Sequence, residues 1–448
     1  MQASFADYIK GSKARFVEDF RTFVRQPSVS AQSLGMVECS RLLRDMMQSV
    51  GIDSKIVQTR GHPLVYGEVK SKKSRRTLLV YDHYDVQPPE PLEKWHCDPF
   101  EGKIEGDRIY GRGTSDSKGN VFAYIKAVEA FLKTTRDVPC NLKFIWEGEE
   151  EEGSPHLATY LREHKEELQA DEVHMCDGRM GELSFGSKGL CYLELRVRTA
   201  DHDLHSGKAG PIVDNAAWKL IWFLNSLKSA DGRVKIAGFY DDVVKPSPAD
   251  KKAIREMNVD ANQLKSDMGL DKLPEGKSIR DLMTAQLFYP TCNIAGFQSG
   301  YTGSGSKTVL PGDAMCKIDM RLVVNQRSDD IYKKFMAHLK EYGPRNVEVK
   351  RYPGGEASKT PLDAPIGKVM LEAHRRTYGT KPLVAPAGWG SIPFWVWSDI
   401  LGLKPVLGGS STGYVNAHAP NEWNTLSGLM DGIRYFGEIA KIFGNHQK

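Results

Sequence analysis

Three short apolar runs of strand length, each followed at once by acidic residues, constrain the fold of this chain more than any other feature. The runs are 77–81, 142–146 and 172–176, and helical patterns at 120–132 and 154–168 lie between them. Strands that alternate with helices in this way indicate βαβ units and a mostly parallel sheet. Ligands of open α/β sheets bind beyond the carboxyl ends of the strands, so the residues after these runs are candidates for chemistry.

The residues that follow the three runs are rich in carboxylates and have no matching set of Lys or Arg. Asp82-His83-Tyr84-Asp85 follows the first run, an EGEEEE stretch at 147–152 follows the second, and Asp177 follows the third. Carboxylates that meet at one edge repel one another unless a cation lies among them. The sequence therefore favours a divalent metal site at this edge of the sheet.

Each of these motifs also has an ordinary structural interpretation when it is taken alone. Asp85 is placed to orient a ligating His83, but a His-x-Asp pattern is more often structural. Asp116 lies in a glycine-rich turn before a helix and would serve equally well as its N-cap. The glutamates at 149–152 fit the solvated start of a helix, although the buried run before them places the first ones at a strand end.

The hydrophobic pattern changes near Gly189. Residues 193–198 and 317–322 alternate apolar and charged side chains, as half-solvated antiparallel strands do, and helical patterns accompany them. We therefore predict an α/β fold, with a mostly parallel sheet flanked by helices and an inserted α+β domain. The predicted boundaries are 1–188 and 358–448 for the interrupted larger domain and 189–357 for the insertion, with an excursion at 241–274 inside it.

The composition excludes several classes of protein. Lys and Arg number 61 and Asp and Glu 57, so the net charge of +4 is small for 448 residues, and we expect no nucleic-acid partner. The most apolar stretch, 392–403, is too short to span a bilayer, and the N-terminal residues lack a signal-peptide core, so we expect no membrane contact. Seven scattered cysteines without a Cys-x-x-Cys pair indicate a reducing, cytoplasmic location.

A few further polar residues are candidates for ligand contacts. Arg321 lies on the charged face of its alternating strand, where it is either a carboxylate clamp or a surface arginine. Thr308 ends a glycine-rich loop that differs from a P-loop by one inserted serine and leads into extended chain, so we reject nucleotide binding there. His205 and His418 lie in turn-like stretches, where a lone histidine usually has no special role.

Taken together, these motifs resemble a family of co-catalytic zinc metallopeptidases and amidohydrolases. The family includes carnosinase, cytosolic non-specific dipeptidase, carboxypeptidase G, aminoacylase, succinyl-diaminopimelate desuccinylase and acetylornithine deacetylase, and the dipeptidase branch is the most similar. The matching stretches, in the order of the family, are HYDVQ (83–87), WHCDPFEGKIEGDRIYGRGTSDSKG (95–119), EGEEEEGS (147–154), DLHSG (203–207), GYTGSGSKTVLPGDAMCKIDMRLV (300–323) and GSIPF (390–394).

The resemblance implies two divalent metal ions, zinc in the first place, with manganese or cobalt as alternatives. The implied metal ligands are His83, Asp116 as the bridge, Glu151, Asp177 and His418. The resemblance also makes Glu150 the catalytic acid–base residue and Asp85 the residue that orients His83. The order of the two glutamates follows from Gly153-Ser154, which lie after the ligand glutamate at the family spacing.

The resemblance further implies that the inserted domain is a lid and forms a homodimer. His205 would reach the active site of the partner subunit and help to stabilise the oxyanion, which makes it a catalytic residue. The implied contacts to the carboxylate end of the substrate are Thr308, Arg321, Gly390 and Ser391.

The implied activity is hydrolysis of an amide bond in a dipeptide or short peptide by a metal-activated water, with Glu150 as general base and then general acid. One departure concerns the substrate: dipeptidases of this branch usually have Arg-Glu-Gly-Gly-Ser where this chain has Ala-Gly-Trp389-Gly-Ser391. An N-acyl-amino-acid amidohydrolase is therefore the alternative. A non-catalytic metal-binding dimer is a remote second alternative, because the set of ligands is complete.

Overall fold

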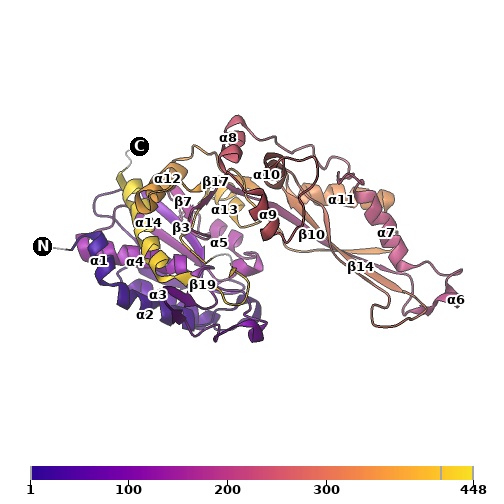
Figure 1. The fold of residues 1–448 in the computed structure, drawn as a ribbon, viewed down its shortest axis with the longest axis horizontal. Helices are drawn as coiled ribbons and strands as arrows, with labels where there is room; N and C mark the ends of the chain where they lie inside the picture. Colours follow the sequence, from indigo (N-terminus) through magenta and orange to yellow (C-terminus); the bar gives the residue numbers. More distant parts are fainter. Residues whose placement is uncertain (1–2, 414–415, 446–448) are drawn as a thin grey trace.

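The computed structural model describes residues 3–413 and 416–445, which form a larger rounded part and an elongated smaller part (Figure 1). The larger part is built on one sheet whose strand order, within the described residues, is β1-β2-β6-β3-β7-β18-β8-β17. The strands are β1 (Asp53–Val57), β2 (Leu64–Val69), β3 (Thr77–His83), β6 (Asn141–Glu147), β7 (Glu172–Met175), β8 (Glu182–Ser184), β17 (Leu383–Ala385) and β18 (Val406–Leu407).

The centre of this sheet is parallel, because β6, β3, β7 and β18 all run the same way. Successive residues of β3 pack on opposite faces: Leu78 and Val80 belong to one core cluster, and Leu79 and Tyr81 to another. The first face is covered by α1 (Phe5–Gly11), α2 (Lys13–Arg25), α3 (Met36–Ser49), α4 (Lys118–Thr135), α12 (Pro365–Tyr378) and α14 (Leu426–Asn445). The second is covered by α5 (Leu157–Glu163) and α13 (Phe394–Asp399). The predicted α/β fold is confirmed.

The smaller part is an antiparallel sheet with helices on one face. Its strand order is β12 (Asn293–Ser299), β14 (Asp313–Leu322), β10 (Gly189–Arg198) and β15 (Val347–Arg351). Alternate residues of β10 and β14 are buried against α7 (Ala216–Leu227) and α11 (Ser328–Tyr342), as the alternating pattern predicts. At the far end lie β11 (Leu204–His205), β13 (Val309–Leu310) and α6 (Ser206–Ala209) (Figure 1).

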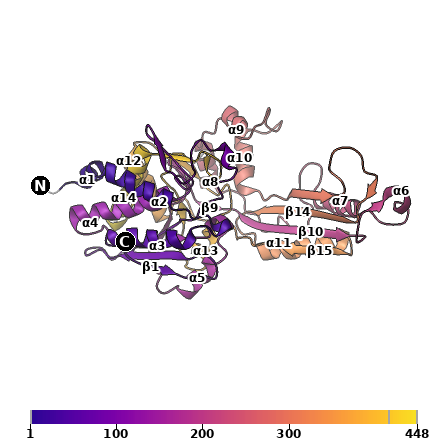
Figure 2. The ribbon, with the colours of Figure 1, turned by 90° about the horizontal axis from the view of Figure 1, so that it is seen from below.

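The excursion extends beyond the predicted 241–274 to residue 288, and its helices return to the larger part. They are α8 (Pro248–Glu256), α9 (Ala261–Asp267) and α10 (Ile279–Phe288). Apolar residues of α8 and α10 form one cluster with Leu383, Ala387 and Trp389 of the larger part. An ion pair between Lys359 and Asp250 at 2.9 Å adds to this contact. Both ribbon views show these helices at the junction of the two parts (Figures 1 and 2).

Short elements complete the fold. They are β4 (Lys103–Glu105), β5 (Arg108–Tyr110) and β19 (Trp423–Thr425) in one sheet, the pair β9 (Gly186–Ser187) and β16 (Ser358–Lys359), and the 3-10 turns η1 (Ser30–Gln32), η2 (Leu92–Lys94) and η3 (Glu150–Glu152). All seven cysteines are free thiols. Among the described residues, no helix has the length and apolar character needed to cross a membrane.

Candidate functional site

The predicted ligand residues meet at the carboxyl ends of β3, β6 and β7. His83 is the last residue of β3, Glu151 lies in η3 after β6, and Asp177 follows β7. The Asp116 carboxylate lies between two imidazoles, with Oδ1 at 3.2 Å from His83 Nε2 and Oδ2 at 3.1 Å from His418 Nε2. His418 Nε2 is also 3.2 Å from Glu151 Oε2. Residues more than 300 positions apart thus form one cluster.

The donor atoms of this cluster suit divalent metal ions. Candidate ligand atoms of His83, Asp116 and Glu151 lie within 4.8 Å of one another, as do those of Asp82, His83 and Asp177. Among the described residues, Glu151 Oε1 and Asp177 Oδ1 are buried and accept no hydrogen bond. Buried carboxylate oxygens without donors are costly unless a cation binds them, and imidazole nitrogen with carboxylate oxygen is a common zinc ligand set. The residues therefore fit a metal site.

The electrostatics of the cluster agree with this interpretation. Burial raises the pKa of Glu150 and of Asp177 well above the ordinary carboxyl value. Burial would also raise the pKa of Asp116, but hydrogen bonds from His418 and His83 outweigh it, so that pKa is lowered. Contacts with Asp116 and then Glu151 raise the pKa of His418 to about 10. The carboxylates thus favour positive charge at their centre, as a cation-binding site requires.

Asp85 contacts both His83 and the turn that contains Glu150 and Glu151. His83 Nδ1 bonds to the backbone carbonyl of Asp85 at 3.0 Å, and the Asp85 carboxylate is farther away at 3.5 Å. That carboxylate instead accepts the backbone N–H groups of Glu150 at 3.2 Å and of Glu151 at 3.1 Å. Asp85 therefore contacts the imidazole through its carbonyl and, at the longer distance, its carboxylate, and it holds the glutamate turn through its side chain.

Sequence reasoning missed two buried carboxylates that support the ligands. Glu422 accepts hydrogen bonds from the loop that contains Asp116: the donors are Arg112 Nη1 (2.9 Å), Gly113 N (3.0 Å), Ser115 N (2.8 Å), Ser115 Oγ (3.0 Å) and Asp116 N (3.0 Å). Asp82 accepts from His83 N at 2.8 Å and from the side chains of Ser117 and Cys176. In the sequence, only Asp82 could have been noticed, because it is adjacent to His83; no pattern indicates Glu422.

The predicted substrate contacts fall into two groups. Arg321 Nη1 donates to Ser391 Oγ at 2.8 Å, and the neighbouring Gly390 carbonyl accepts from Lys188 N at 2.7 Å, so this group lies at the junction of the two parts. His205 and Thr308 lie instead at the far end of the smaller part, where β11 pairs with β13 and His205 is exposed (Figure 1). Within one chain, these two residues do not join the junction group.

Trp389 packs against the excursion. Its indole Nε1 donates to Glu182 Oε1 at 2.7 Å, and its ring adjoins the apolar cluster of α8 and α10. The tryptophan thus anchors the loop that ends in Gly390 and Ser391.

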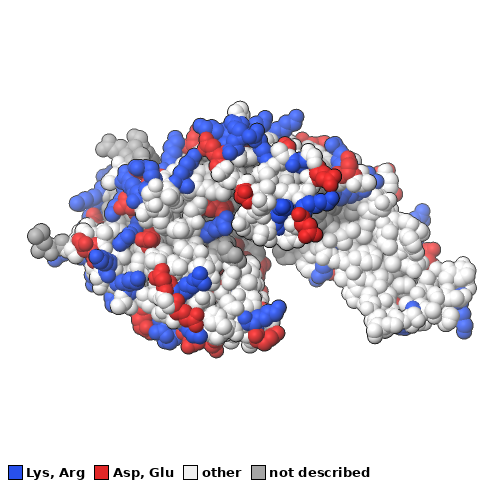
Figure 3. All heavy atoms as spheres, in the orientation of Figure 1, with Lys and Arg blue, Asp and Glu red and all other residues white. Residues whose placement is uncertain are grey.

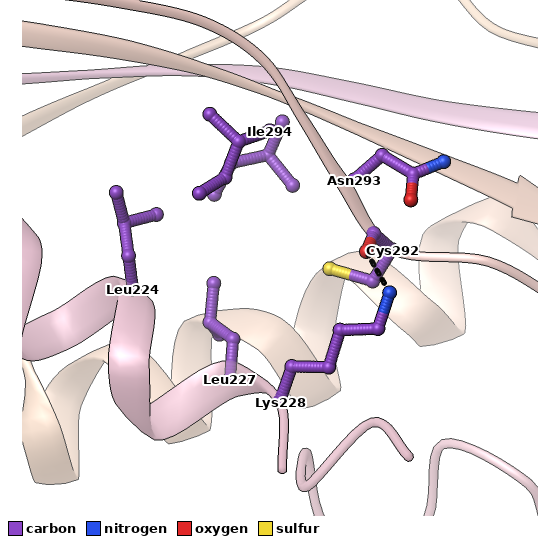
Figure 4. Close-up of a pocket in the computed structure, with 7 residues that line it drawn as sticks. Leu224, Leu227, Lys228, Cys292, Asn293 and Ile294 are labelled. Atoms are coloured by element: carbon purple, nitrogen blue, oxygen red, sulfur yellow. Dashed lines mark hydrogen bonds between the residues drawn. The ribbon is translucent and has the colours of Figure 1, made fainter. Parts of the chain in front are cut away.

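A cavity of about 210 Å³ lies in the smaller part between α7 and the sheet (Figure 4). Its lining is mostly apolar and includes Leu224, Leu227 and Ile294, and Lys228 Nζ donates to the Cys292 carbonyl at 3.2 Å. Burial raises the pKa of the Cys292 thiol to about 11, so this thiol is protonated near neutral pH. None of the residues that line this cavity belongs to the acidic cluster.

Imidazoles and carboxylates cluster at the carboxyl edge of a mostly parallel sheet, and Arg321 lies where the smaller part joins the larger one. This arrangement defines the class of metal-dependent hydrolases. The comparison with family models agrees, because residues 79–442 match the model of peptidase family M20/M25/M40. The chain belongs to this family. The prediction of a metallopeptidase is thereby confirmed, and the chain is a hydrolase of peptide bonds. The predicted likeness to the dipeptidase branch is confirmed by two named relatives, both dipeptidases.

Named relatives cover most of the chain. The Cys-Gly metallodipeptidase dug1 of Schizosaccharomyces pombe is 30% identical over 403 residues, which are 85% of this chain and 83% of the relative. The Beta-Ala-His dipeptidase of Mus musculus is 29% identical over 406 residues, 86% of this chain and 81% of the relative.

Two solved structures have the same fold over nearly their whole length. The M20 family metallo-carboxypeptidase Sso-CP2 from Sulfolobus solfataricus is 34% identical with a TM-score of 0.91, covering 96% of this chain and 99% of that one. Human carnosine dipeptidase 1 is 24% identical with a TM-score of 0.83 and full coverage of both chains (100% and 100%).

Proposed function

We propose that this chain hydrolyses dipeptides or short peptides that end in a free carboxylate, and that the reaction depends on two divalent metal ions. The observation that carries the proposal is the single cluster of His83, Asp116, Glu151 and His418, with Asp177 beside it. The relatives support this substrate class, because they include a dipeptidase, a metallodipeptidase and a metallo-carboxypeptidase.

We assign the predicted ligands to the metals, with Asp116 between His83 and His418 as the bridging residue. Zinc is the first choice, and manganese or cobalt are the alternatives. When bound there, the ions supply Lewis acidity, which polarises a carbonyl and makes water more acidic. Glu422 and Asp82 hold the loop and the strand end that present these ligands.

Glu150 is the proposed proton-transfer residue. It precedes the ligand Glu151 in η3, and its backbone N–H is fixed by Asp85. In this role its carboxylate takes a proton from the attacking water and then gives it to the leaving nitrogen of the peptide. Arg321 and Ser391 hold the terminal carboxylate of the substrate and so keep the scissile bond in place.

We also propose a homodimer formed through the smaller part. α7 exposes Trp218, Ile221 and Trp222, and the edge strand β12 exposes Ile294 and Phe297. Large apolar side chains gathered on one exposed face mark an interaction surface. On the face seen in Figure 3, this end of the molecule has few charged side chains, whereas charges of both signs cover the larger part.

In the proposed dimer, His205 and Thr308 have a role that they cannot have within a single chain. Both lie at the far end of the smaller part, and in the proposed dimer they reach the site of the other subunit, where His205 stabilises the oxyanion. The free thiols of all seven cysteines support a cytoplasmic location for this dimer.

The test is an activity panel of dipeptides, N-acyl amino acids and succinylated diamines, with metal analysis of the purified protein. We expect about two zinc or manganese ions per chain, as in other two-metal hydrolases, and loss of hydrolysis on chelation that added metal reverses. Glu150→Gln should abolish turnover and retain the metals. Full activity in metal-free protein contradicts the proposal, and hydrolysis of N-acyl amino acids alone favours the amidohydrolase alternative.

A further inference from the structure

The link between β9 and β10, where the chain crosses from the larger to the smaller part, contains a buried lysine without a role so far. The Lys188 side chain is buried, with 6% of the residue exposed. Its ammonium Nζ donates to the backbone carbonyl of Tyr289, at the end of α10, at 3.1 Å. Among the described residues, no ion pair includes Lys188.

The charged group that acts on the pKa of this ammonium is another cation, Arg321. Burial, and then the positive charge of Arg321, lower the pKa of Lys188 to about 8. Asp319 Oδ1 offsets part of the Arg321 charge, at 3.2 Å from Arg321 Nε, but no carboxylate of the described residues forms an ion pair with Lys188. Two cations held near each other, one of them buried, destabilise the fold unless an anion binds there, and uncompensated charges of this kind mark functional sites.

Backbone contacts fix Lys188 beside the proposed substrate contacts. Its N–H donates to the Gly390 carbonyl at 2.7 Å, and Ser391 Oγ, which accepts from Arg321, approaches the Gly189 carbonyl at 3.4 Å. Leu190 lies opposite Arg321 in the register of β10 and β14. Lys188 precedes Leu190 by two residues, which is the spacing that places side chains on one side of an extended chain.

We propose that Lys188 binds the terminal carboxylate of the substrate together with Arg321 and Ser391, and that it is a specificity-determining residue for substrates with that group. This proposal rests on the proposed hydrolysis of peptides with a free carboxylate. The three side chains come from the crossing between the parts, from β14 of the smaller part and from the loop after β17 of the larger part. A bound carboxylate therefore joins all three segments by charge-assisted hydrogen bonds.

The experiment compares alanyl-leucine with alanyl-leucinamide, which lacks the terminal charge, in wild type, Lys188→Met and Lys188→Arg. We expect Lys188→Met to raise KM for alanyl-leucine about 10- to 100-fold, as expected for loss of a charged hydrogen bond, and to change kcat by no more than about twofold. KM for the amide should stay near the wild-type value. Lys188→Arg should recover part of the affinity. An equal rise of KM for both substrates overturns the proposal.

A matched control is Lys143→Met, which removes a half-buried lysine in β6 whose Nζ donates to the carbonyls of Glu167 (2.6 Å) and Gln169 (2.8 Å). It should leave both KM values unchanged. Met is unbranched and only one atom shorter than Lys, and the substitution removes a buried charge, so we expect Lys188→Met to fold with an undiminished melting temperature.

A binding measurement separates this proposal from the proposed function. If the wild type with added zinc or manganese hydrolyses no compound of the panel, the proposed function is wrong. Titration calorimetry with N-acetyl-leucine and N-acetyl-leucinamide then tests Lys188 directly. Preference for the acid that Lys188→Met abolishes supports the carboxylate site, and equal binding of both compounds to wild type overturns it.

Discussion

At the scale of single residues, the ligand cluster depends on a carboxylate that touches no proposed ligand side chain. Glu422 is fully buried, pairs with Arg112 and accepts backbone N–H groups of the loop that ends in Asp116. We predict that Glu422→Gln, which places an NH2 group against some of these donors, weakens zinc binding about 10- to 100-fold. Competition with a chromophoric chelator measures the affinity. Glu372→Gln, at an exposed ion pair with Arg375, is the control, and equal affinity in both variants contradicts this role for Glu422.

Lys188 leads to a second prediction at this scale, on pH. Its pKa of about 8, lowered by burial and then by Arg321, means that the ammonium is charged below pH 8 and neutral above it. The affinity for a carboxylate should therefore fall as the pH rises through 8. We predict that KM for alanyl-leucine rises between pH 7 and pH 9.5, whereas KM for alanyl-leucinamide does not share this rise. Parallel pH profiles for the two substrates contradict the assignment.

Sequence reasoning found the residues that lie in recognisable motifs and missed those that act from a distance. His83, Asp116 and Asp177 follow strands or turns that a pattern can locate, and the structure has all three at one edge. Glu422 is 306 positions from Asp116 and lies in no motif, so only the folded chain reveals the contact. Lys188 was not predicted for a related reason. Its burial, and the absence of a carboxylate partner for it in the part of the chain that the structure describes, are properties of the tertiary structure.

At the scale of elements, the excursion packs against the substrate loop, which is the loop with Trp389, Gly390 and Ser391. Leu287 of α10 is buried in the cluster that also contains Trp389. We predict that Leu287→Ala destabilises the packing of α10 in this cluster by about 2 to 5 kcal/mol, as is usual for a buried Leu→Ala change. Because Trp389 precedes Gly390 and Ser391, KM should rise as well. Hydrogen exchange of 248–288 measures the loosening.

The control for this prediction is Arg280→Ala, at an exposed position of the same helix. It should change neither the exchange rates nor KM. Faster exchange in Leu287→Ala with an unchanged KM would mean that the excursion does not support the substrate loop.

The strands were easier to predict than the excursion, for a physical reason. The predicted runs 77–81 and 142–146 lie within β3 and β6. They could be recognised because strands that are buried on both faces are apolar throughout. The excursion was expected at 241–274 and was given no structure, yet its helices run from Pro248 to Phe288. Their surfaces are mostly polar, and a small cluster against β17 stabilises them, so the tertiary contact outweighs the weak local signal.

At the scale of the whole molecule, the sequence predicted two parts but not their arrangement. β9 and β16 pair where the chain leaves and re-enters the larger part, which suits the predicted boundaries at 188 and 357, and these boundaries stay a prediction. The distance of His205 from the acidic cluster follows from the length of β10 and β14, which pair along ten residues each. No local sequence pattern reveals that strands of this length separate His205 from the acidic cluster of its own chain.

The proposed dimer makes a prediction about its surface. Trp222 on α7 is 66% exposed, and Trp218 stacks on it one turn earlier. We predict that Trp218→Glu combined with Trp222→Glu converts a dimer into a monomer, because charges disfavour burial of this face. Light scattering coupled to size-exclusion chromatography measures the mass. The monomer should bind the metals and lack turnover, and a wild-type monomer with full activity contradicts the proposal.

A mixed dimer then tests whether His205 acts across the interface. His205→Ala and Glu150→Gln should each be inactive, since one lacks the oxyanion contact and the other the proton-transfer residue. After subunit exchange, a heterodimer has one site with Glu150 from one chain and His205 from the other. Random exchange makes half of the dimers mixed with one intact site each, so activity should return to about a quarter of the wild-type value. No recovery would mean that His205 serves the site of its own chain, and full activity of His205→Ala by itself would mean that His205 serves no site.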